Sequence, residues 1–316
     1  MRTLSAKIHD LLTGLFLARA DARIYACVRM AFALVALMNL LMLWPHRGSF
    51  LTDVGMIDQE LTRQTYRWPY LTVFDWCRDL TSVSVVMIGA GTAMLMLLAG
   101  WLPRLAALAI YVWHVSYAAR GVTALCGWDT VLRCVSFLVL VSPLPAVWTL
   151  TKKRAEAPEA PCYGLTLIRF QLLVIYWQTV LDRLDSQFWL SGEFMGYYLL
   201  SHNARWPVAW VADFDLTLRA LTYLILIVEV ALPVMLMTRR WHRAGLLIGF
   251  LFHFGIFVTS NNLLMFLLAM MVLYAAFLRS EDIDWLTRQA RRLLGTSDAR
   301  QGADQKVRKS RTSRAS

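Results

Sequence analysis

The stretch LTLRALTYLILIVEVALPVMLM, residues 216–237, is apolar over the length that an α-helix needs to cross a lipid bilayer. A spanning helix requires about 20 predominantly apolar residues. Similar stretches recur along the chain, and the full set predicts spans at residues 24–44, 79–99, 103–118, 130–149, 164–184, 216–237, 244–260 and 262–278. We therefore expect an all-α fold, a polytopic membrane helical bundle with about eight transmembrane helices.

The composition is that of a membrane protein. Hydrophobic residues make up 58% of the 316 residues, and the mean hydropathy is +0.50. A soluble protein of this length would not sustain such apolarity. Five cysteines occur without metal-ligand spacing, so no metal site is expected. A disulfide between two of Cys77, Cys126 and Cys134 and small buried thiols both remain compatible with the sequence.

The positions of lysine and arginine predict the orientation. These residues gather in the N-terminal arm, in the loops after the fourth and sixth spans, and in the C-terminal tail. Because cytoplasmic loops retain such residues, we expect all four segments in the cytoplasm, in a multi-pass protein of the plasma (inner) membrane. The same bias accounts for most of the net charge of +11. The lipid membrane is therefore the expected partner, and no nucleic-acid partner is inferred.

The charge and hydropathy patterns divide the chain into four regions. Residues 1–23 are expected to form a cytoplasmic arm with an interfacial amphipathic helix, and residues 24–278 the transmembrane domain. Residues 279–295 pattern as a second interfacial amphipathic helix, because apolar side chains share one helical face and arginines lie elsewhere. The composition of residues 296–316, rich in Ser, Arg and Lys, predicts a disordered basic tail.

Polar residues at membrane depth are candidates for function, because they are costly to keep there. Glu229 lies in the middle of the sixth predicted span and His253 within the seventh. A hydrogen bond between helices is the structural alternative for each. Asp129 opens the fourth span, where a carboxylate also favours the helix dipole and Arg133 stands four residues on as a partner.

A charged cluster ends the fifth predicted span. The stretch VIYWQTVLDRLDSQFW, residues 174–189, places Asp182, Arg183 and Asp185 within about one turn. In one interpretation Asp182 and Arg183 line a cavity and hold a polar ligand group. In the other, the cluster is ion-paired and hydrated at the exterior interface. With the other candidates, it would place carboxylates, an arginine and a histidine in the exterior half of the bundle, around a polar cavity that opens outward.

Several segments resemble the horizontally transferred transmembrane (HTTM) domain, the membrane part of vitamin K-dependent gamma-glutamyl carboxylases. They are GWLPRLAALAIYVWHVSYAARG (100–121), RGVTALCGWDTVLRCVSFLVLVSPLPAVWTL (120–150), YWQTVLDRLDSQFWLSGEFMGYYL (176–199) and TYLILIVEVALPVMLMTRRWHRAGLLIGFLFHFGIF (222–257). The resemblance covers about residues 22–279, so that 24–278 is HTTM-like. It implies that His253, Glu229 and Asp129 match the family's histidine, membrane glutamate and Gly-x-Asp aspartate.

The resemblance breaks at the carboxylases' catalytic lysine. The matching positions here are Asp182 and Arg183, and an arginine stays protonated and cannot act as the base. Gamma-carboxylation is therefore not expected. The carboxylases also continue into a large lumenal region that engages the substrate's propeptide. This chain ends soon after its eighth predicted span, so we do not expect peptide recognition of that type.

Two functions from different classes follow. The favoured one is a non-enzymatic membrane factor that binds, or assists the maturation or export of, a secreted peptide or a partner protein. The alternative is an enzyme that modifies an exported peptide or acts on a quinone-like cofactor, as the resemblance implies. Its candidate catalytic residues are His253, Glu229 and Asp182, and the candidate ligand-binding residues are Arg183, Asp185 and Asp129.

Overall fold

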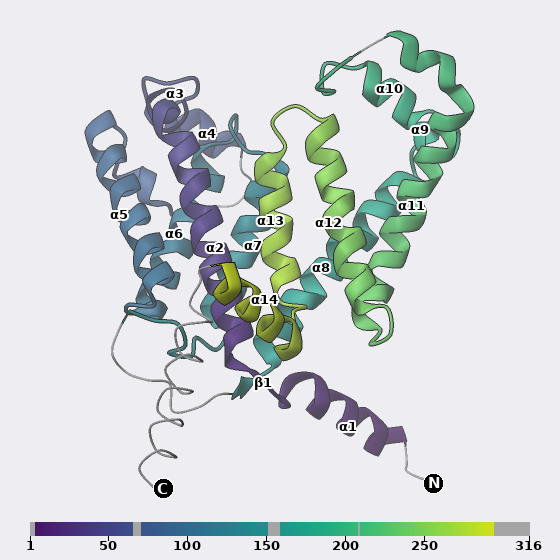
Figure 1. The fold of residues 1–316 in the computed structure, drawn as a ribbon. Helices are drawn as coiled ribbons and strands as arrows, with labels where there is room; N and C mark the ends of the chain where they lie inside the picture. Colours follow the sequence, from purple (N-terminus) through teal and green to yellow (C-terminus); the bar gives the residue numbers. More distant parts are fainter. Residues whose placement is uncertain (1–3, 66–70, 151–158, 208, 294–316) are drawn as a thin grey trace, which may run out of the picture. The chain divides into compact units, whose positions relative to one another are not determined.

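The computed structural model describes residues 4–65, 71–150, 159–207 and 209–293 (Figure 1). It separates into two compact units, Met1–Phe277 and Leu278–Ser316. The first unit holds the membrane bundle. The second holds α14 (Ser280–Leu293), which coincides with the amphipathic helix expected at 279–295. The predicted disordered tail at 296–316 lies outside the described residues.

Each of the eight predicted spans corresponds to a helix of the first unit. These helices are α2 (Ala22–Leu43), α5 (Leu80–Ala99), α6 (Pro103–Arg120), α7 (Gly127–Val141), α8 (Tyr163–Leu184), α11 (Asp215–Met237), α12 (His242–Thr259) and α13 (Leu264–Ala275). Among the described residues, five helices are long and apolar enough to cross a membrane: α2, α5, α8, α11 and α12. α13 is a shorter apolar helix. The all-α polytopic membrane bundle is thereby confirmed.

The fourth predicted span was placed wrongly at its C-terminal end. We expected a helix over 130–149, but α7 ends at Val141. Ser142 is extended, with φ −72° and ψ 159°, and it precedes Pro143. A residue before proline avoids the helical region, and proline itself offers no N–H to the helix. The apolar residues that follow therefore extend the hydrophobic pattern without extending the helix.

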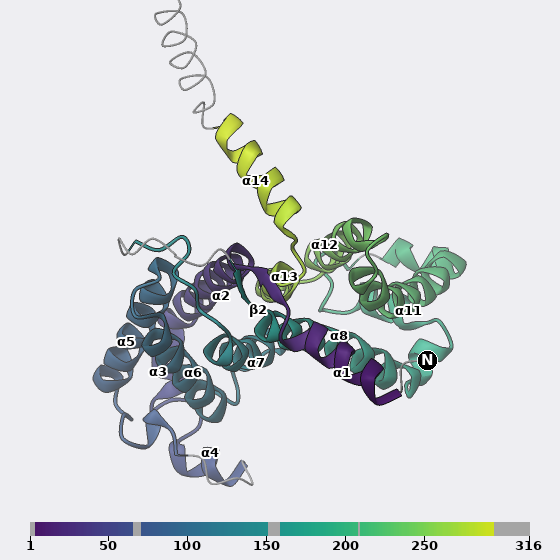
Figure 2. The same cartoon turned by 90° about the horizontal axis from the view of Figure 1, so that it is seen from below.

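The helices pack as two groups that α13 connects (Figures 1 and 2). In one group α2 packs against α5 and α7, and α6 packs against α5 and α7. In the other, α11 packs against α8 and α12. α13 contacts α2 and α7 on one side and α8 and α12 on the other. A site built on α8, α11, α12 and α13 therefore contacts the first group through α13 and α8.

Short elements cluster at the end of the bundle where α2 and α8 begin. β1 (Arg19–Asp21) pairs antiparallel with β2 (Glu159–Pro161), a contact the sequence did not predict. α1 (Leu4–Phe16), the helix expected in the N-terminal arm, packs against α8 at the same end. Arg29 also lies there, buried, and its Nη2 donates to the carbonyl oxygens of Val147 and Trp148 at 3.1 and 2.9 Å. This is the end that the charge pattern assigns to the cytoplasm.

The opposite end carries the long connections. The chain between α2 and α5 forms η1 (Trp44–His46), α3 (Arg47–Leu51), α4 (Gln59–Thr65) and η2 (Val73–Asp75). The chain between α8 and α11 forms α9 (Gln187–Leu190), α10 (Phe194–Leu200) and η3 (Ala209–Phe214). The sequence assigns both connections to the exterior.

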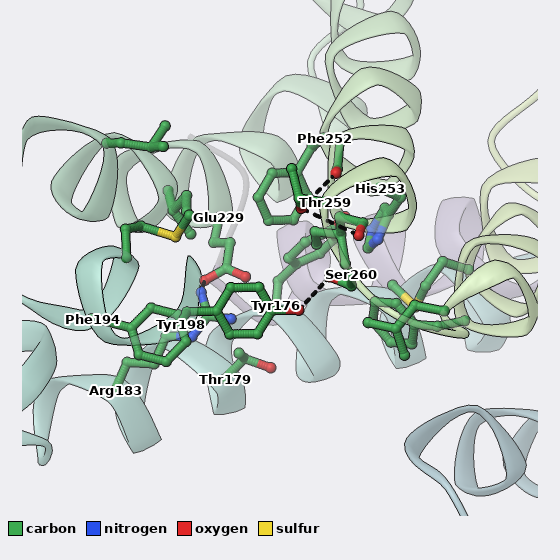
Figure 3. A pocket seen from close by; sticks show the side chains of 18 of the residues that line it. Tyr176, Thr179, Arg183, Phe194, Tyr198, Glu229, Phe252, His253, Thr259 and Ser260 are labelled. Atoms are coloured by element: carbon green, nitrogen blue, oxygen red, sulfur yellow. Dashed lines mark hydrogen bonds and ion pairs between the residues drawn. The ribbon is translucent and has the colours of Figure 1, made fainter. Parts of the chain in front are cut away.

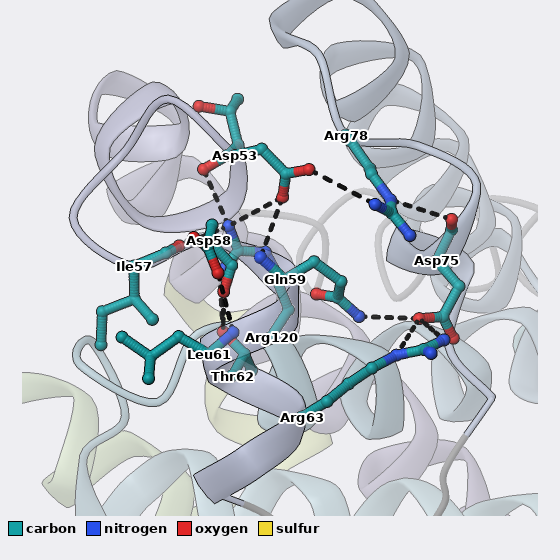
Figure 4. A network of polar contacts seen from close by, with 11 residues as sticks. Asp53, Ile57, Asp58, Gln59, Leu61, Thr62, Arg63, Asp75, Arg78 and Arg120 are labelled. Carbon is teal, nitrogen blue, oxygen red and sulfur yellow. Dashed lines mark hydrogen bonds and ion pairs between the residues drawn. The ribbon is translucent and has the colours of Figure 1, made fainter.

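Buried Arg120 fastens the first connection to α6 (Figure 4). Its Nη2 donates to the carbonyl oxygens of Thr52 and Ile57, each at 2.8 Å, and its Nη1 donates to Thr62 Oγ1 at 3.2 Å. Asp75 organises the neighbouring part, accepting from Gln59 Nε2 at 2.8 Å and from Arg63 Nη2 at 2.6 Å. These contacts tie the described residues on either side of 66–70 to one another and to α6.

Candidate functional site

A cavity of about 450 Å³ lies between α8, α10, α11, α12 and α13 (Figure 3). Most of the side chains that line it are apolar. On α11 the lining residues Leu221, Ile225 and Glu229 are spaced by four, so they share one helical face. The polar residues of the lining are Tyr176, Thr179, Arg183, Tyr198, Glu229, His253, Thr259 and Ser260.

An ion pair between Arg183 and Glu229 crosses the cavity wall from α8 to α11. The side chain of Glu229 is only 4% exposed and that of Arg183 is 21% exposed. The guanidinium of Arg183 also lies over the ring of Trp189, 4.1 Å from its centroid. A carboxylate in an apolar bundle needs a counter-charge, and Arg183 supplies it from a neighbouring helix. The two charges offset each other, so the cavity offers a strong local dipole rather than a net charge.

His253 belongs to a chain of buried hydrogen bonds on the α13 side of the cavity. Its Nε2 lies 2.7 Å from the hydroxyl of Tyr176, which in turn lies 2.6 Å from the hydroxyl of Tyr274. The ring of Phe266 packs edge-on against the imidazole, with centroids 5.4 Å apart. His253 Nδ1 is buried and has no hydrogen-bond partner among the described residues. Nε2 therefore takes part in the contact between α12 and α8, whereas Nδ1 does not.

The segment around α10 covers the outer end of the cavity. The Phe194 ring stacks on that of Trp189, with centroids 4.0 Å apart, and Tyr198 hydrogen-bonds to Ser260 at the end of α12. Asn261 Nδ2 donates to the carbonyl oxygens of His202 and Ala204, at 2.9 and 3.0 Å. The turn between α12 and α13 is thereby tied to this cover.

Not all of the residues proposed from the sequence meet at this cavity. Arg183, Glu229 and His253 line it, but Asp182 and Asp185 are exposed and outside the lining. Asp182 instead accepts from Gln178 Nε2 on its own helix, at 2.7 Å. Arg183 thus lines the cavity as the first interpretation requires, whereas Asp182, which that interpretation also placed there, lies outside the lining together with Asp185.

Asp129 lies apart from the cavity, at the start of α7. It is buried and accepts from the backbone N–H of Cys126 and from Asn39 Nδ2, both at 2.8 Å. The expected pair with Arg133 is not among the ion pairs of the described residues. Its contacts are those of a carboxylate that closes the first turn of a helix.

Sequence reasoning missed the tyrosines. Tyr176 stands seven residues before Arg183, which is two helical turns, so both lie on the face of α8 that lines the cavity. That spacing could have identified Tyr176 from the sequence. Tyr198 and Tyr274 come from other helices, and the sequence holds no such signal for them.

A metal site or a disulfide would require suitable side chains to lie close together, and the described residues bear on both. The described residues contain no group of three or more His, Cys, Asp or Glu side chains suited to a metal ion. The five cysteines, all within the described residues, are free thiols. The polar groups that the lining presents are the ion pair, the histidine and the hydroxyl groups.

The chain is distantly similar to the sporulation-delaying protein SdpB of Bacillus subtilis (strain 168). The two are 27% identical over 173 residues, which cover 49% of this chain and 51% of SdpB. The chain thus matches about half the length of that relative. No protein-family model matches the chain, and no solved structure matches it. The apolar helices of the described residues indicate a membrane protein.

Proposed function

We propose that this chain is an HTTM-like integral membrane protein of the plasma (inner) membrane that binds a secreted peptide or a partner protein and assists its maturation or export. The cavity beside Arg183, Glu229 and His253 would receive a mostly apolar segment of that partner that carries a polar group, and it would open toward the extracytoplasmic side. The segments that resemble the HTTM domain supply all three residues.

One observation carries the proposal: an ion pair is kept inside a cavity whose walls are otherwise mostly apolar. Buried pairs add little stability over well-packed apolar residues of similar volume. A pair retained at this place is therefore better explained by recognition of a polar group on a ligand. The cavity volume falls within the range of about 300–1,000 Å³ that is common for ligand sites.

Site-specific photo-cross-linking in the native membrane tests this proposal. A photoreactive residue at Leu221 faces the cavity, whereas one at Leu224 lies on an exposed face of the same helix. We expect a discrete peptide or protein adduct from position 221, and only bulk-lipid adducts from position 224. Bulk-lipid adducts alone at both positions would contradict the proposal.

The uncommitted nitrogen of His253 favours an enzyme as the second candidate. His253 and Glu229 would serve as acid/base groups and Arg183 as an anion anchor, while Asp182 would take part only from outside the cavity. The residues present fit a quinone-like cofactor, because apolar walls suit its ring and Arg183, Tyr198 and His253 can donate to its oxygens. When bound, it would supply redox chemistry.

Intact-mass analysis of co-expressed exported peptides separates the two candidates. A discrete mass change that appears with the wild type and is lost in His253→Ala would support the enzyme. Unchanged peptide masses, together with a position-221 adduct, would support the binding factor.

A further inference from the structure

A second cavity lies between α6, α7 and α8, away from the site described above. Its volume is about 490 Å³, and its lining includes Tyr111, Arg133, Phe137 and Gln171. None of these residues lines the cavity that holds His253. Arg133 gives the second cavity a positive charge within a helix of the membrane bundle.

In the part of the chain that the structure describes, no acidic side chain pairs with Arg133. The carboxylate expected to pair with it, Asp129, is occupied by Cys126 and Asn39. Among the described residues, no ion pair or hydrogen bond to the guanidinium of Arg133 is recorded, although the residue is half-buried. An intramembrane cation in this condition points to an anionic group from outside the chain.

The charged residue of the lining lies nearer the end assigned to the exterior, and the lining further in is mostly apolar apart from Gln171 and the hydroxyl of Tyr111. Arg133 is six residues from the start of α7, or about 9 Å along the helix axis from the end assigned to the exterior. Phe137 and Leu138 line the next turn inward, and Val115 and Tyr111 line successive turns of α6. Phe137 is 47% exposed, which leaves this side of the cavity open to the surroundings of the helix. An arginine near the interface, with mostly apolar side chains deeper in the cavity, matches the phosphate and the acyl chains of a phospholipid.

We propose that this cavity binds a phospholipid of the outer leaflet, with its phosphate paired to Arg133 and an acyl chain along Phe137 and Val115. Guanidinium and phosphate form two parallel charge-assisted hydrogen bonds, and phosphate at the headgroup level lies within reach of an arginine side chain at this depth. The bound lipid supplies the counter-charge that Asp129 does not.

Native mass spectrometry of the full chain in mild detergent tests this inference with three probes. Phosphatidylglycerol carries both phosphate and acyl chains, diacylglycerol carries the chains alone, and inorganic phosphate carries the anion alone. We expect only phosphatidylglycerol to bind tightly to the wild type. Arg133→Gln should weaken that binding at least about tenfold, whereas Arg133→Lys should keep part of it. Arg104→Gln is the matched control, because Arg104 donates to the carbonyl of Leu140 and should leave lipid binding unchanged.

Thermal unfolding separates a lipid site from a purely structural arginine. Without added lipid, Arg133→Gln should unfold at or above the wild-type temperature, since it removes an unpaired charge. It should also lose the rise in unfolding temperature that phosphatidylglycerol gives the wild type. Equal binding of phosphatidylglycerol by Arg133→Gln, or equal binding of diacylglycerol by the wild type, would overturn the inference. So would a marked loss of lipid-free stability in Arg133→Gln, which would mean that the arginine pairs with protein instead.

Discussion

At Glu229 a single carboxylate lies within an apolar helix, and Arg183 on α8 pairs with it. Because both groups lie at the cavity wall, the pair can take part in ligand recognition as well as in packing between helices. If recognition rather than stability maintains it, then removing both charges should be tolerated better than removing one.

We expect Glu229→Gln to destabilise the protein by about 3 kcal/mol, because it leaves the Arg183 charge without its partner. The double variant Arg183→Met/Glu229→Met should recover most of that loss. Thermal unfolding in detergent measures both. A double variant that loses the sum of the two single effects would show that the pair is a stabilising element instead.

Asp75 in the exterior connection predicts a pH dependence. Burial alone would raise the pKa of Asp75, but hydrogen bonds from the Thr72 N–H, Arg63 and Gln59 outweigh it and hold the pKa below the ordinary value of 3.8. A carboxyl with a lowered pKa in the fold stabilises the folded form above its unfolded pKa. That contribution is lost as the pH falls through the folded pKa.

Hydrogen exchange of α4 measures this effect. At neutral pH Asp75→Asn should speed exchange of the α4 amides relative to the wild type. The difference between the two proteins should begin to shrink below about pH 4, the ordinary pKa of an aspartate, and disappear as the pH falls through the lowered pKa of the folded carboxyl. A difference that persists at acid pH would mean that the charge of Asp75 is not what holds α4.

At the residue scale the sequence could identify some site residues and not others. Glu229 and His253 stood out because polar groups are expensive at membrane depth. The inward direction of Arg183 and the outward direction of Asp182 depend on where α11 packs, which helical spacing alone does not specify. The engagement of Asp129 by Asn39 joins residues ninety positions apart, so the local partner Arg133 was expected in its place.

At the scale of elements, hydropathy placed the helices well because each span must bury its backbone groups within itself. Most boundaries agree within a few residues. The prediction was wrong at the end of α7, because the apolar composition continues past Pro143 whereas the helix ends before it. The contacts between helices could not be predicted from the sequence, and the close approach of α12 and α13 at Gly249 is one of them.

Gly249→Ala should disturb the hydrogen-bonded chain of His253. A Cβ at position 249 would overlap the ring of Tyr274, whose hydroxyl bonds to Tyr176. We expect a loss of about 1–3 kcal/mol in stability from this overpacking, measured by thermal unfolding. Gly255→Ala on the same helix is the control, because nothing lies within 4 Å of its added Cβ. Equal stability of the two variants would contradict the packing described for α12 and α13.

At the scale of the whole molecule, the orientation of the bundle stays a prediction from lysine and arginine. Val54, 94% exposed, lies on the connection assigned to the exterior, and exposed Arg240 lies between α11 and α12 on the side assigned to the cytoplasm. In a variant whose native cysteines are replaced, Val54→Cys should react with an impermeant maleimide in intact cells. Arg240→Cys should react only after permeabilisation. The reverse pattern would invert the bundle and place the cavity toward the cytoplasm.

We propose above all that the cavity between α8, α10, α11, α12 and α13 binds a specific molecule. Mass spectrometry of what co-purifies with the protein in mild detergent tests it most directly. We compare wild type, His253→Ala and Arg183→Met/Glu229→Met with Asp182→Asn, whose side chain lies outside the cavity. The account predicts a discrete molecule or peptide in the wild type and Asp182→Asn that is lost from the other two. Bulk lipid alone, unchanged across all four proteins, would contradict it.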